Sequence, residues 1–363
     1  MAVIGSASAF IESTLAQVYK TKDGKDFRGG PSYYMEKALG KRWMGVLFSV
    51  LLIICFAYGF NGLQSSALEY YIPGYSESSY PMIVGLILAV GTGLIIFGGV
   101  HRIGFITSVM VPIMAGAYLL MGLFTIVTHL PQLPGIFAMI LSEAFDFQAI
   151  FGGMAGSAVV IGIKRGLFSN EAGMGSAPNA AASASVSHPA KQGMVQVISV
   201  FIDTLLICSA TAMMLLLSGV QGEAGVLDGI PFVQKAISAN VGTWGIHFIT
   251  ASIFAFAFSS LIGNYYYAES NILFIKNNKV LLFVFRCTCL LAVFLGAQAD
   301  FSLVWNLADI TMGCMAIVNI IAILLLGNIA LKVLKDYETQ KKAGKNPVFK
   351  AENVGIKNTD CWK

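Results

Sequence analysis

The amino-acid sequence predicts an all-α polytopic membrane protein, and three observations carry this prediction. Hydrophobic residues make up 56% of the 363 positions and only 12% are charged, against about 25% in an ordinary soluble domain. The apolar residues occur in repeated runs of roughly 20, the length of a helix that crosses a bilayer. Lysine and arginine gather in alternate connections between these runs, as in membrane proteins of fixed orientation. The formal net charge of +4 does not indicate a nucleic-acid partner.

Nine apolar stretches predict transmembrane helices. In chain order they lie near 1–19, 43–66, 81–99, 104–128, 146–163, 194–219, 242–268, 279–297 and 302–329. Between the fourth and the fifth, residues 134–145 predict a short amphipathic helix at the surface. We therefore expect one transmembrane domain over residues 1–330. From Leu331 the chain turns polar and lysine-rich, which predicts a disordered tail over residues 331–363.

The basic residues predict how the chain is oriented in the membrane. All but one of the 23 lysines and arginines lie in alternate connections or in the tail, and the opposite connections hold only Lys235. Because the basic side of a membrane protein faces the cytoplasm, we expect a multi-pass protein of the cell membrane with a cytoplasmic C-terminus. Nine spans then place Met1 outside. The apolar run begins at that first residue, so we expect that a segment upstream is missing.

Cysteine and histidine give no sign of a catalytic or metal site. The six cysteines fall mostly inside apolar runs without the spacing of a zinc site, and the four histidines are scattered among loops and one helix. Buried cysteines of this kind usually act as small hydrophobic side chains. A membrane enzyme would need a placed acid, base or metal cluster, so we predict that the chain is not an enzyme and has no cofactor.

Charged and amide side chains inside the predicted spans indicate a polar pathway. Such groups at bilayer depth cost a few kcal/mol each and usually face a bundle interior or water. Each one alone is explained equally well as an interhelical hydrogen bond that holds the bundle together. Ten of them, in or directly after five of the predicted spans, favour the pathway. They are Glu12, Asn61, Gln64, Asp203, Asn264, Glu269, Asn271, Asn306, Asp309 and Asn319.

A cluster of small residues lies in the fifth predicted span. Gly152, Gly153, Gly156 and Ser157 occur within seven residues of one another. Glycines allow a helix to unwind, and unwound backbone at membrane depth is tolerated where it lines a cavity and binds a substrate carboxylate or a coupling ion. The alternative is a packing face made by Gly152 and Gly156, four residues apart. The spacing leaves both interpretations open.

Two adjacent hydroxyls in the seventh span suggest a cation site. The oxygens of Ser259 and Ser260 are hard ligands of the kind that bind a desolvated small cation. Alternatively, each serine donates to the carbonyl one turn earlier and binds nothing. The spacing again leaves both alternatives open.

The connection between residues 162 and 188 has an unusual composition. It combines Arg165, Ser169, Asn170 and Glu171 with four glycines and a run of alanines. It lacks the G-x-x-x-x-G-K-[ST] pattern of a phosphate-binding loop, and no strand precedes it. Small residues allow a loop to pack closely against helix ends, so we predict that this connection is a moving gate.

Residues 165–178 read Arg-Gly-Leu-Phe-Ser-Asn-Glu-Ala-Gly-Met-Gly-Ser-Ala-Pro, which resembles the signature of the alanine or glycine:cation symporter family, also called the sodium:alanine symporter family. Residues 29–36 resemble the G-G-P-M-Y-Y segment of that family, and residues 98–103 resemble its G-G-x-x-R-I turn. Further matches occur in the family's order at residues 188–189, 192–193, 201–204 and 306–310. The resemblance covers about residues 1–330.

This resemblance implies a leucine-transporter-type fold. Such a bundle has two inverted repeats of five helices, each opening with a discontinuous helix, and this family adds one helix at the N-terminus. Residues 1–19 then match the third family helix, and the fifth span, with Gly152 and Gly153, matches the discontinuous helix of the second repeat. The family extra helix and its first discontinuous helix, with a Gly-Thr-Gly-Asn stretch, have no counterpart here. We therefore expect an N-terminally truncated bundle.

The resemblance also implies a function. Family members couple sodium, or sometimes protons, to uptake of alanine, glycine and related neutral amino acids. Ser259 and Ser260 match the positions expected to bind sodium, and Gln64 matches a glutamine that faces the substrate. Asn264 stands where many members have tryptophan, and its amide suits a more polar substrate such as glutamine. The alternative is a non-transporting truncated remnant or a regulatory membrane protein of the same family; the oligomeric state stays open.

Overall fold

The computed structural model describes residues 2–24, 26–67, 80–145, 154–222 and 229–362. The described chain is almost entirely helical, and its one sheet is a two-stranded antiparallel hairpin of β1 (Thr21–Asp23) and β2 (Asp26–Arg28). In chain order the main helices are α1 (Ala2–Val18), α2 (Pro31–Lys37), α3 (Arg42–Leu52), α4 (Asn61–Ser66), α5 (Tyr80–Ile96), α6 (Val100–Thr128), α7 (Leu133–Ala144), α9 (Met154–Asn170), α10 (Ala177–Ser183), α11 (Pro189–Phe201), α12 (Cys208–Leu216), α13 (Gly229–Val241), α14 (Trp244–Ile275), α15 (Lys279–Gly296) and α16 (Phe301–Lys342).

Within the described residues, six helical segments are long and apolar enough to cross a membrane. They are Arg42–Ser66, Arg102–Thr128, Pro189–Leu216, Trp244–Ile275, Lys279–Gly296 and Phe301–Lys342. The predicted spans near 1–19 and 81–99 form the shorter apolar helices α1 and α5. The span predicted at 146–163 begins outside the described residues and continues as α9. The chain is therefore a helical protein with several membrane-crossing helices, and nine spans stay a prediction.

Two of these long segments contain π-helical turns in their middle. Residues 53–60 (η1) join α3 to α4, and residues 202–207 (η4) join α11 to α12. A π-helical turn adds a residue and interrupts the regular ladder of hydrogen bonds, and such turns occur frequently at functional sites. Here η4 contains Asp203, one of the polar residues predicted to face a pathway.

Small residues allow several helices to approach closely. Helices α1 and α11 pack along each other, and a Cβ atom on Gly193 of α11 would collide with Thr14 and Phe10 of α1. Gly62 of α4 and Gly296 of α15 meet in the same way, since a Cβ on Gly296 would lie 2.5 Å from the Gly62 Cα. Close backbone packing of this kind is typical of helices in membranes.

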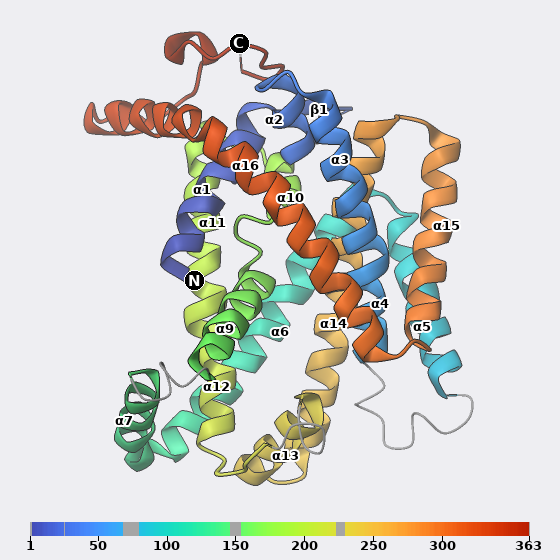
Figure 1. Ribbon diagram of the computed structural model, residues 1–363, viewed down its shortest axis with the longest axis vertical. Helices are drawn as coiled ribbons and strands as arrows, with labels where there is room; N and C mark the ends of the chain where they lie inside the picture. The colour runs from blue at the N-terminus through green and yellow to red at the C-terminus, as the bar shows by residue number, and fades with distance from the viewer. Residues whose placement is uncertain (1, 25, 68–79, 146–153, 223–228, 363) are drawn as a thin grey trace.

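The buried core lies among α1, α3, η1, α14 and α16, which crosses the molecule diagonally (Figure 1). Its largest fully buried side chains include Tyr34, Phe48, Phe56 and Tyr265. The outward faces of α5, α6 and α15 instead carry exposed leucine, isoleucine and phenylalanine side chains. An exposed apolar surface of this extent is expected of a protein surrounded by lipid. Helix α7 has no buried residue, as predicted for a surface helix at residues 134–145.

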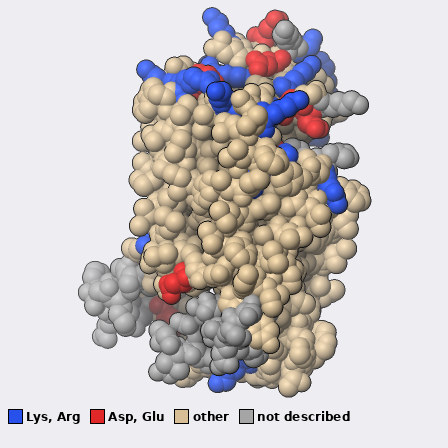
Figure 2. Space-filling view, turned by 90° about the vertical axis from the view of Figure 1, so that its right-hand side faces the viewer, with Lys and Arg blue, Asp and Glu red and all other residues tan. Residues whose placement is uncertain are grey.

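Charge is distributed unevenly along the length of the molecule. Figure 2 shows most of the visible lysine and arginine side chains at one end, above an apolar middle. This end, called the charged end below, is formed by the β-hairpin, α2, the connection from α10 to α11 and the C-terminal residues (Figure 1). The uneven placement of basic residues predicted from the sequence is present in the structure.

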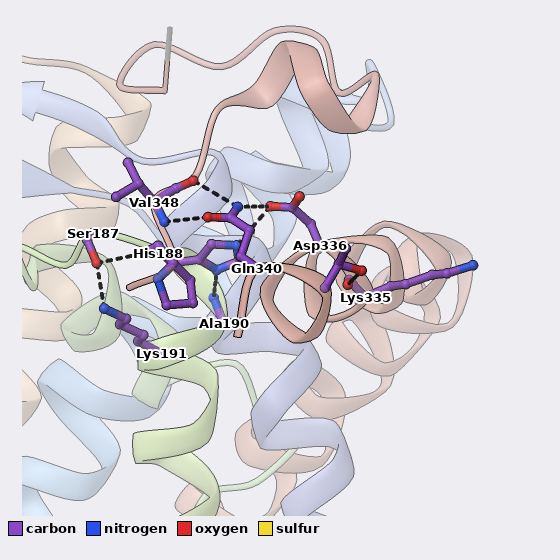
Figure 3. Close-up of polar contacts among 10 residues, drawn as sticks. Ser187, His188, Ala190, Lys191, Lys335, Asp336, Gln340 and Val348 are labelled. Carbon is purple, nitrogen blue, oxygen red and sulfur yellow. Dashed lines mark hydrogen bonds and ion pairs between the residues drawn. The ribbon is translucent and has the colours of Figure 1, made fainter. Parts of the chain in front are cut away.

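The prediction of a disordered tail over residues 331–363 is wrong for the described part of it. Helix α16 continues to Lys342, and the chain then folds back through a short 3-10 turn at Ala351–Val354. Phe349 and Trp362 are buried. Gln340 on α16 fixes the return, because its side-chain amide donates to Val348 O (3.0 Å) and accepts from Val348 N (2.9 Å) (Figure 3). A few apolar anchors thus order a segment whose composition is otherwise polar.

Candidate functional site

A cavity of about 440 Å³ lies between α6, α14 and the connection that follows α9. Helix α14 contributes Ser259, Ser260, Gly263, Asn264, Tyr266 and Tyr267 to its lining; the connection and α10 contribute Glu171, Ala180 and Ser183; and α6 contributes Ile103, Gly104, Thr107 and Val111. This space is called the central cavity below. It brings together both predicted sodium ligands, the predicted substrate residue Asn264 and one predicted gate residue.

Helical geometry explains why α14 presents so many polar groups to this space. Positions 259, 260, 263, 264 and 267 repeat at intervals of three and four residues, which places them on one helix face. Ser259 Oγ donates to Phe256 O at 2.8 Å, so the back-bonding alternative is present for this serine. That bond uses the hydroxyl proton and leaves oxygen lone pairs available to a cation. Asn264 is buried, with 7% of its surface exposed.

Glu171 supplies the only carboxylate among the described residues that line the central cavity. It follows directly after α9 and has a φ of 53°, which is uncommon for a residue with a side chain and is concentrated at functional sites. Ser176 Oγ donates to Glu171 Oε2 at 2.6 Å. The backbone therefore turns sharply here and directs the carboxylate into the cavity wall.

A second, more polar cavity of about 290 Å³ lies on the other side of Glu171. Glu171, Ala180 and Tyr267 line both cavities and so separate them. The remaining lining of the second cavity includes Glu12, Ser169, Asn170, Gln196, Ser199 and Asp203. Ser169 Oγ donates to Asp203 Oδ2 at 2.5 Å, which places this serine against the π-helical turn of η4. Three of the four predicted gate residues thus surround one space.

Arg165, the fourth predicted gate residue, lies apart from both cavities. Its guanidinium pairs with Asp309 on α16 at 2.9 Å and lies 4.4 Å from the ring centroid of Trp305. An ion pair combined with a cation–π contact is a strong way to hold an arginine in place. Arg165 therefore connects α9 to α16.

The structure does not bring every predicted substrate residue to the central cavity. Gln64 lies in α4 and is not among the described lining residues of either cavity. Gly156 and Ser157 lie in the helical backbone of α9. Gly152 and Gly153 lie outside the described residues. The predicted unwound backbone at these glycines stays a prediction.

Sequence reasoning did not identify the polar network that holds the loop after α9. The buried Glu12 carboxylate accepts from Gly173 N (3.1 Å) and from Asn319 Nδ2 (2.8 Å). Asn319 also donates to Gly173 O (3.0 Å) and accepts from the Tyr34 hydroxyl. Four separate elements are joined in this way. The signal in the sequence was the placement of Glu12 and Asn319 inside apolar helices, which did not reveal that they meet.

Backbone conformation and close packing require glycine at two positions of this loop. Gly173 and Gly175 have φ values of 86° and 84°, a region that glycine adopts at no steric cost. A Cβ atom on Gly175 would also lie within 2.9 Å of Pro31, Asn319 and Phe48. Only glycine fits there.

The oxygen atoms around the central cavity are suitable ligands for a small hard cation. No group of three or more histidine, cysteine, aspartate or glutamate side chains able to hold a metal ion occurs within the described residues. Hydroxyl, amide and carboxylate oxygens are the ligands that hard cations prefer. Ser259, Ser260, Asn264 and Glu171 bring these oxygens to one cavity.

Sequence comparison with known proteins identifies the family. A sequence model of the sodium:alanine symporter family matches residues 1–351. The chain is 48% identical to the amino-acid carrier protein AlsT of Bacillus subtilis over 364 residues, which cover 100% of this chain and 77% of AlsT. It is also 48% identical to the probable sodium/glutamine symporter GlnT of the same organism (100% of this chain, 76% of GlnT). Identity to the sodium/alanine symporter AgcS of Methanococcus maripaludis is 34% (95% of this chain, 77% of AgcS). The chain therefore belongs to the sodium:alanine symporter family, a family of transporters and not of enzymes.

Proposed function

We propose that this protein carries out sodium-coupled symport of a small neutral amino acid across the cell membrane by alternating access. The observation that supports this most is the convergence of Ser259, Ser260, Asn264 and Glu171 on one cavity in a member of this family. Alanine, glycine and glutamine are the candidate substrates. Relatives named for alanine and for glutamine both match the chain.

The chemistry of the substrate fits the groups that line the central cavity. A neutral amino acid at pH 7 is a zwitterion with one ammonium group and one carboxylate. In this proposal the Glu171 carboxylate attracts positive charge, whether the ammonium group or the sodium ion, because a charge pair is stronger in a cavity than in water. Ser259 and Ser260 supply oxygen ligands to sodium. The amide of Asn264 faces the substrate side chain.

The proposal includes an architecture and an orientation. It takes residues 1–330 as a transmembrane domain of about nine helices in the leucine-transporter arrangement, with the charged end and the lysine-rich residues 331–363 in the cytoplasm. The gathering of basic residues at one end supports this orientation (Figure 2), since basic residues are retained on the cytoplasmic side. Gln64, Gly152, Gly153, Gly156 and Ser157 keep their proposed places in the substrate path.

The gate in this proposal is the wall between the two cavities. Glu171 and Tyr267 form part of that wall, and Ser169 and Asn170 lie on its far side. Movement of the loop after α9 would join the two spaces and open a route for the substrate. The Arg165–Asp309 pair would keep α9 attached to α16 during this movement.

The test is uptake of labelled amino acid into proteoliposomes, with and without an inward sodium gradient, by the wild type and by the double variant Ser259→Ala/Ser260→Ala. We expect sodium-driven accumulation by the wild type and loss of the sodium dependence in the double variant. Ser142→Ala is the matched control, because Ser142 back-bonds to Met139 O in the same way but on the exposed helix α7. Unchanged sodium coupling in the double variant would reject the assigned sodium ligands.

The alternative hypothesis from the sequence is a non-transporting remnant or a regulatory membrane protein of the family. It predicts no uptake under any gradient by a protein that is folded and inserted in the membrane. The same vesicles therefore separate the two hypotheses.

A further inference from the structure

The residues that follow α16 fold back across the charged end and contact three other parts of the chain. Residues 343–362, called the strap below, leave α16 at Lys342 and end beside α1 and α2. The strap carries an internal anchor as well, since Ala351 N donates to Trp362 O at 3.2 Å. It is thus an ordered layer over helix ends that belong to separate parts of the bundle (Figure 1).

The first attachment is to the beginning of α11. Phe349 N donates to Ser187 O (2.9 Å), and Ser187 Oγ donates to Pro347 O (2.9 Å). Lys191 Nζ donates to Asn346 Oδ1 at 2.8 Å and to Ser187 Oγ at 2.7 Å. Figure 3 shows Ser187 and Lys191 grouped beside the strap residue Val348.

His188 sits in the centre of this attachment and is fully buried. Its Nδ1 accepts from Ala190 N (3.2 Å) at the start of α11, while Nε2 lies 3.2 Å from Asp336 Oδ2 on α16 (Figure 3). Since Nδ1 accepts a hydrogen bond, the proton is on Nε2, and the ring is neutral. Phe349 of the strap packs edge-on against this ring, with the centroids 5.2 Å apart.

The second and third attachments are to α1 and α2. Trp362 Nε1 donates to Gln17 O (2.7 Å) at the end of α1, and the Lys20 ammonium lies 5.0 Å from a Trp362 ring centroid. At α2, Lys37 pairs with Asp360 at 2.8 Å, and Asn358 donates to Lys37 O at 3.1 Å. The strap is therefore held by hydrogen bonds, an ion pair and a buried tryptophan.

The helices joined by the strap are held to different neighbours. Helix α1 packs along α11, whereas α2 is attached to α14, because Ser32 donates to Asn271 (2.6 Å) and Tyr33 to Ser270 O (3.4 Å). The strap bridges these two groups at the charged end. Any movement that separates α1 and α11 from α2 and α14 at this end must break strap contacts, in addition to direct bonds between the two groups such as that from Lys37 Nζ to Tyr19 O (3.0 Å).

We propose that the strap is an autoinhibitory contact which holds the charged end closed and whose detachment permits the transport cycle. This inference rests on the proposed function, because transport requires one end of the molecule to open. Removal of the strap should raise the initial uptake rate roughly fivefold or more, the scale of a typical coupling free energy between two conformations. Occupation of the central cavity by substrate should in turn loosen the strap.

The experiment compares sodium-driven alanine uptake by the full chain, a truncation after Gly344, and Trp362→Ala. Val348→Ala is the matched control, because Val348 lies in the strap and the residue is 54% exposed. Monodisperse elution in detergent establishes that each variant is folded. We expect faster uptake by the truncation and by Trp362→Ala, and an unchanged rate for Val348→Ala. Equal or slower uptake by a folded truncation would overturn the proposal.

A second readout does not depend on transport. The rate at which a maleimide modifies Cys361 is followed by peptide mass spectrometry in the full chain, since Cys361 Sγ lies only 3.5 Å from Lys20 O and is partly covered. We expect a faster reaction in Trp362→Ala and on addition of sodium and alanine. If no variant transports, the proposed function fails, and the strap is then judged by this rate alone: insensitivity to Trp362→Ala would refute it.

Discussion

Two carboxylates on opposite sides of the loop after α9 have contrasting environments. Glu12 also lines the second cavity, but it is fully buried and both of its carboxylate oxygens accept hydrogen bonds, one from Gly173 N and the other from Asn319. Glu171 lines both cavities, and its side chain accepts a hydrogen bond from Ser176. A buried polar group with its partners in place stabilises and specifies a structure. The Glu171 carboxylate, which lines both cavities, remains available to a ligand. The loop after α9 thus has a structural side, where it is held by Glu12 and Asn319, and a functional side, where Glu171 faces the central cavity.

The largest expected effect lies on the structural side. Gly175→Ala should destabilise the protein by about 2–4 kcal/mol, because it combines an unfavourable φ with overpacking against Pro31, Asn319 and Phe48. Gly219→Ala is the matched control, since Gly219 also has a positive φ (66°) but nothing within 4 Å of its Cβ position. The measurement is the thermal unfolding midpoint in detergent. Equal losses in the two variants would show that the loop is not tightly packed.

Exchange of the two carboxylates for amides should separate stability from transport. Glu12→Gln places an amide where Asn319 and Gly173 both donate, and an unmatched buried donor costs about 1–3 kcal/mol. Glu171→Gln should leave the unfolding midpoint nearly unchanged but lower uptake at least about tenfold, a loss of 1.4 kcal/mol in binding. Thermal unfolding and uptake are measured on both variants. A large loss of stability in Glu171→Gln with normal uptake would show that Glu171 has a structural role and no role in transport.

A smaller effect is expected at Asn264, which belongs to the functional side. Asn264→Ala removes the amide from the central cavity, so the preference for glutamine over alanine should fall by a factor of about ten, the scale of one lost hydrogen bond. Competition of unlabelled glutamine and alanine against labelled alanine measures this ratio. An unchanged ratio would show that Asn264 does not contact the side chain of the substrate.

The smallest effect concerns pH at the charged end. Burial lowers the pKa of His188 from its usual 6.5, and Asp336 opposes this only in part. The attached strap therefore favours neutral His188. The contribution of His188 to strap attachment is fully present above pH 6.5 and is lost as the pH falls through the lowered pKa. Tyr337 of α16 and Lys191 also face the ring. Burial lowers the pKa of Lys20 to about 8, so Lys20 is mostly protonated at pH 7.5 and becomes fully protonated as the pH falls.

Cys361 modification measured from pH 7.5 to 5.5 tests this prediction. We expect the modification rate, corrected for thiolate content, to rise in the wild type as the pH is lowered. The rise should be smaller in His188→Asn, which retains a side-chain oxygen that can accept from Ala190 N. Parallel profiles for the two proteins would show that His188 does not control the strap.

The sequence predicted the helical membrane class because hydrophobicity is a local property that a run of about 20 residues reveals. It also predicted a cation site at Ser259 and Ser260 from their adjacent hydroxyls. That Asn264 lies on the same helix face follows from helical periodicity, which is equally local, but this was not predicted. It did not predict the strap, since the contact of Trp362 with Gln17 joins residues at opposite ends of the chain. For the same reason Glu12 and Asn319 were recognised as polar residues inside helices but not as partners.

The π-helical turn that carries Asp203 had no signal in the sequence either, because it depends on packing around the helix. The predicted place of Gln64 in the substrate path came from resemblance alone, and the described lining of the central cavity does not include it. Glu171 was predicted as part of a gate from the composition of its loop. Its position between two cavities is a consequence of the turn at φ 53°.

The most direct test of the account is uptake of labelled alanine, glycine and glutamine into proteoliposomes that contain the full chain, with and without an inward sodium gradient, beside Glu171→Gln. We predict sodium-driven accumulation of at least one of the three by the wild type and its loss in Glu171→Gln. Accumulation that is independent of sodium, or equal in the two proteins, would contradict the proposed role of the central cavity.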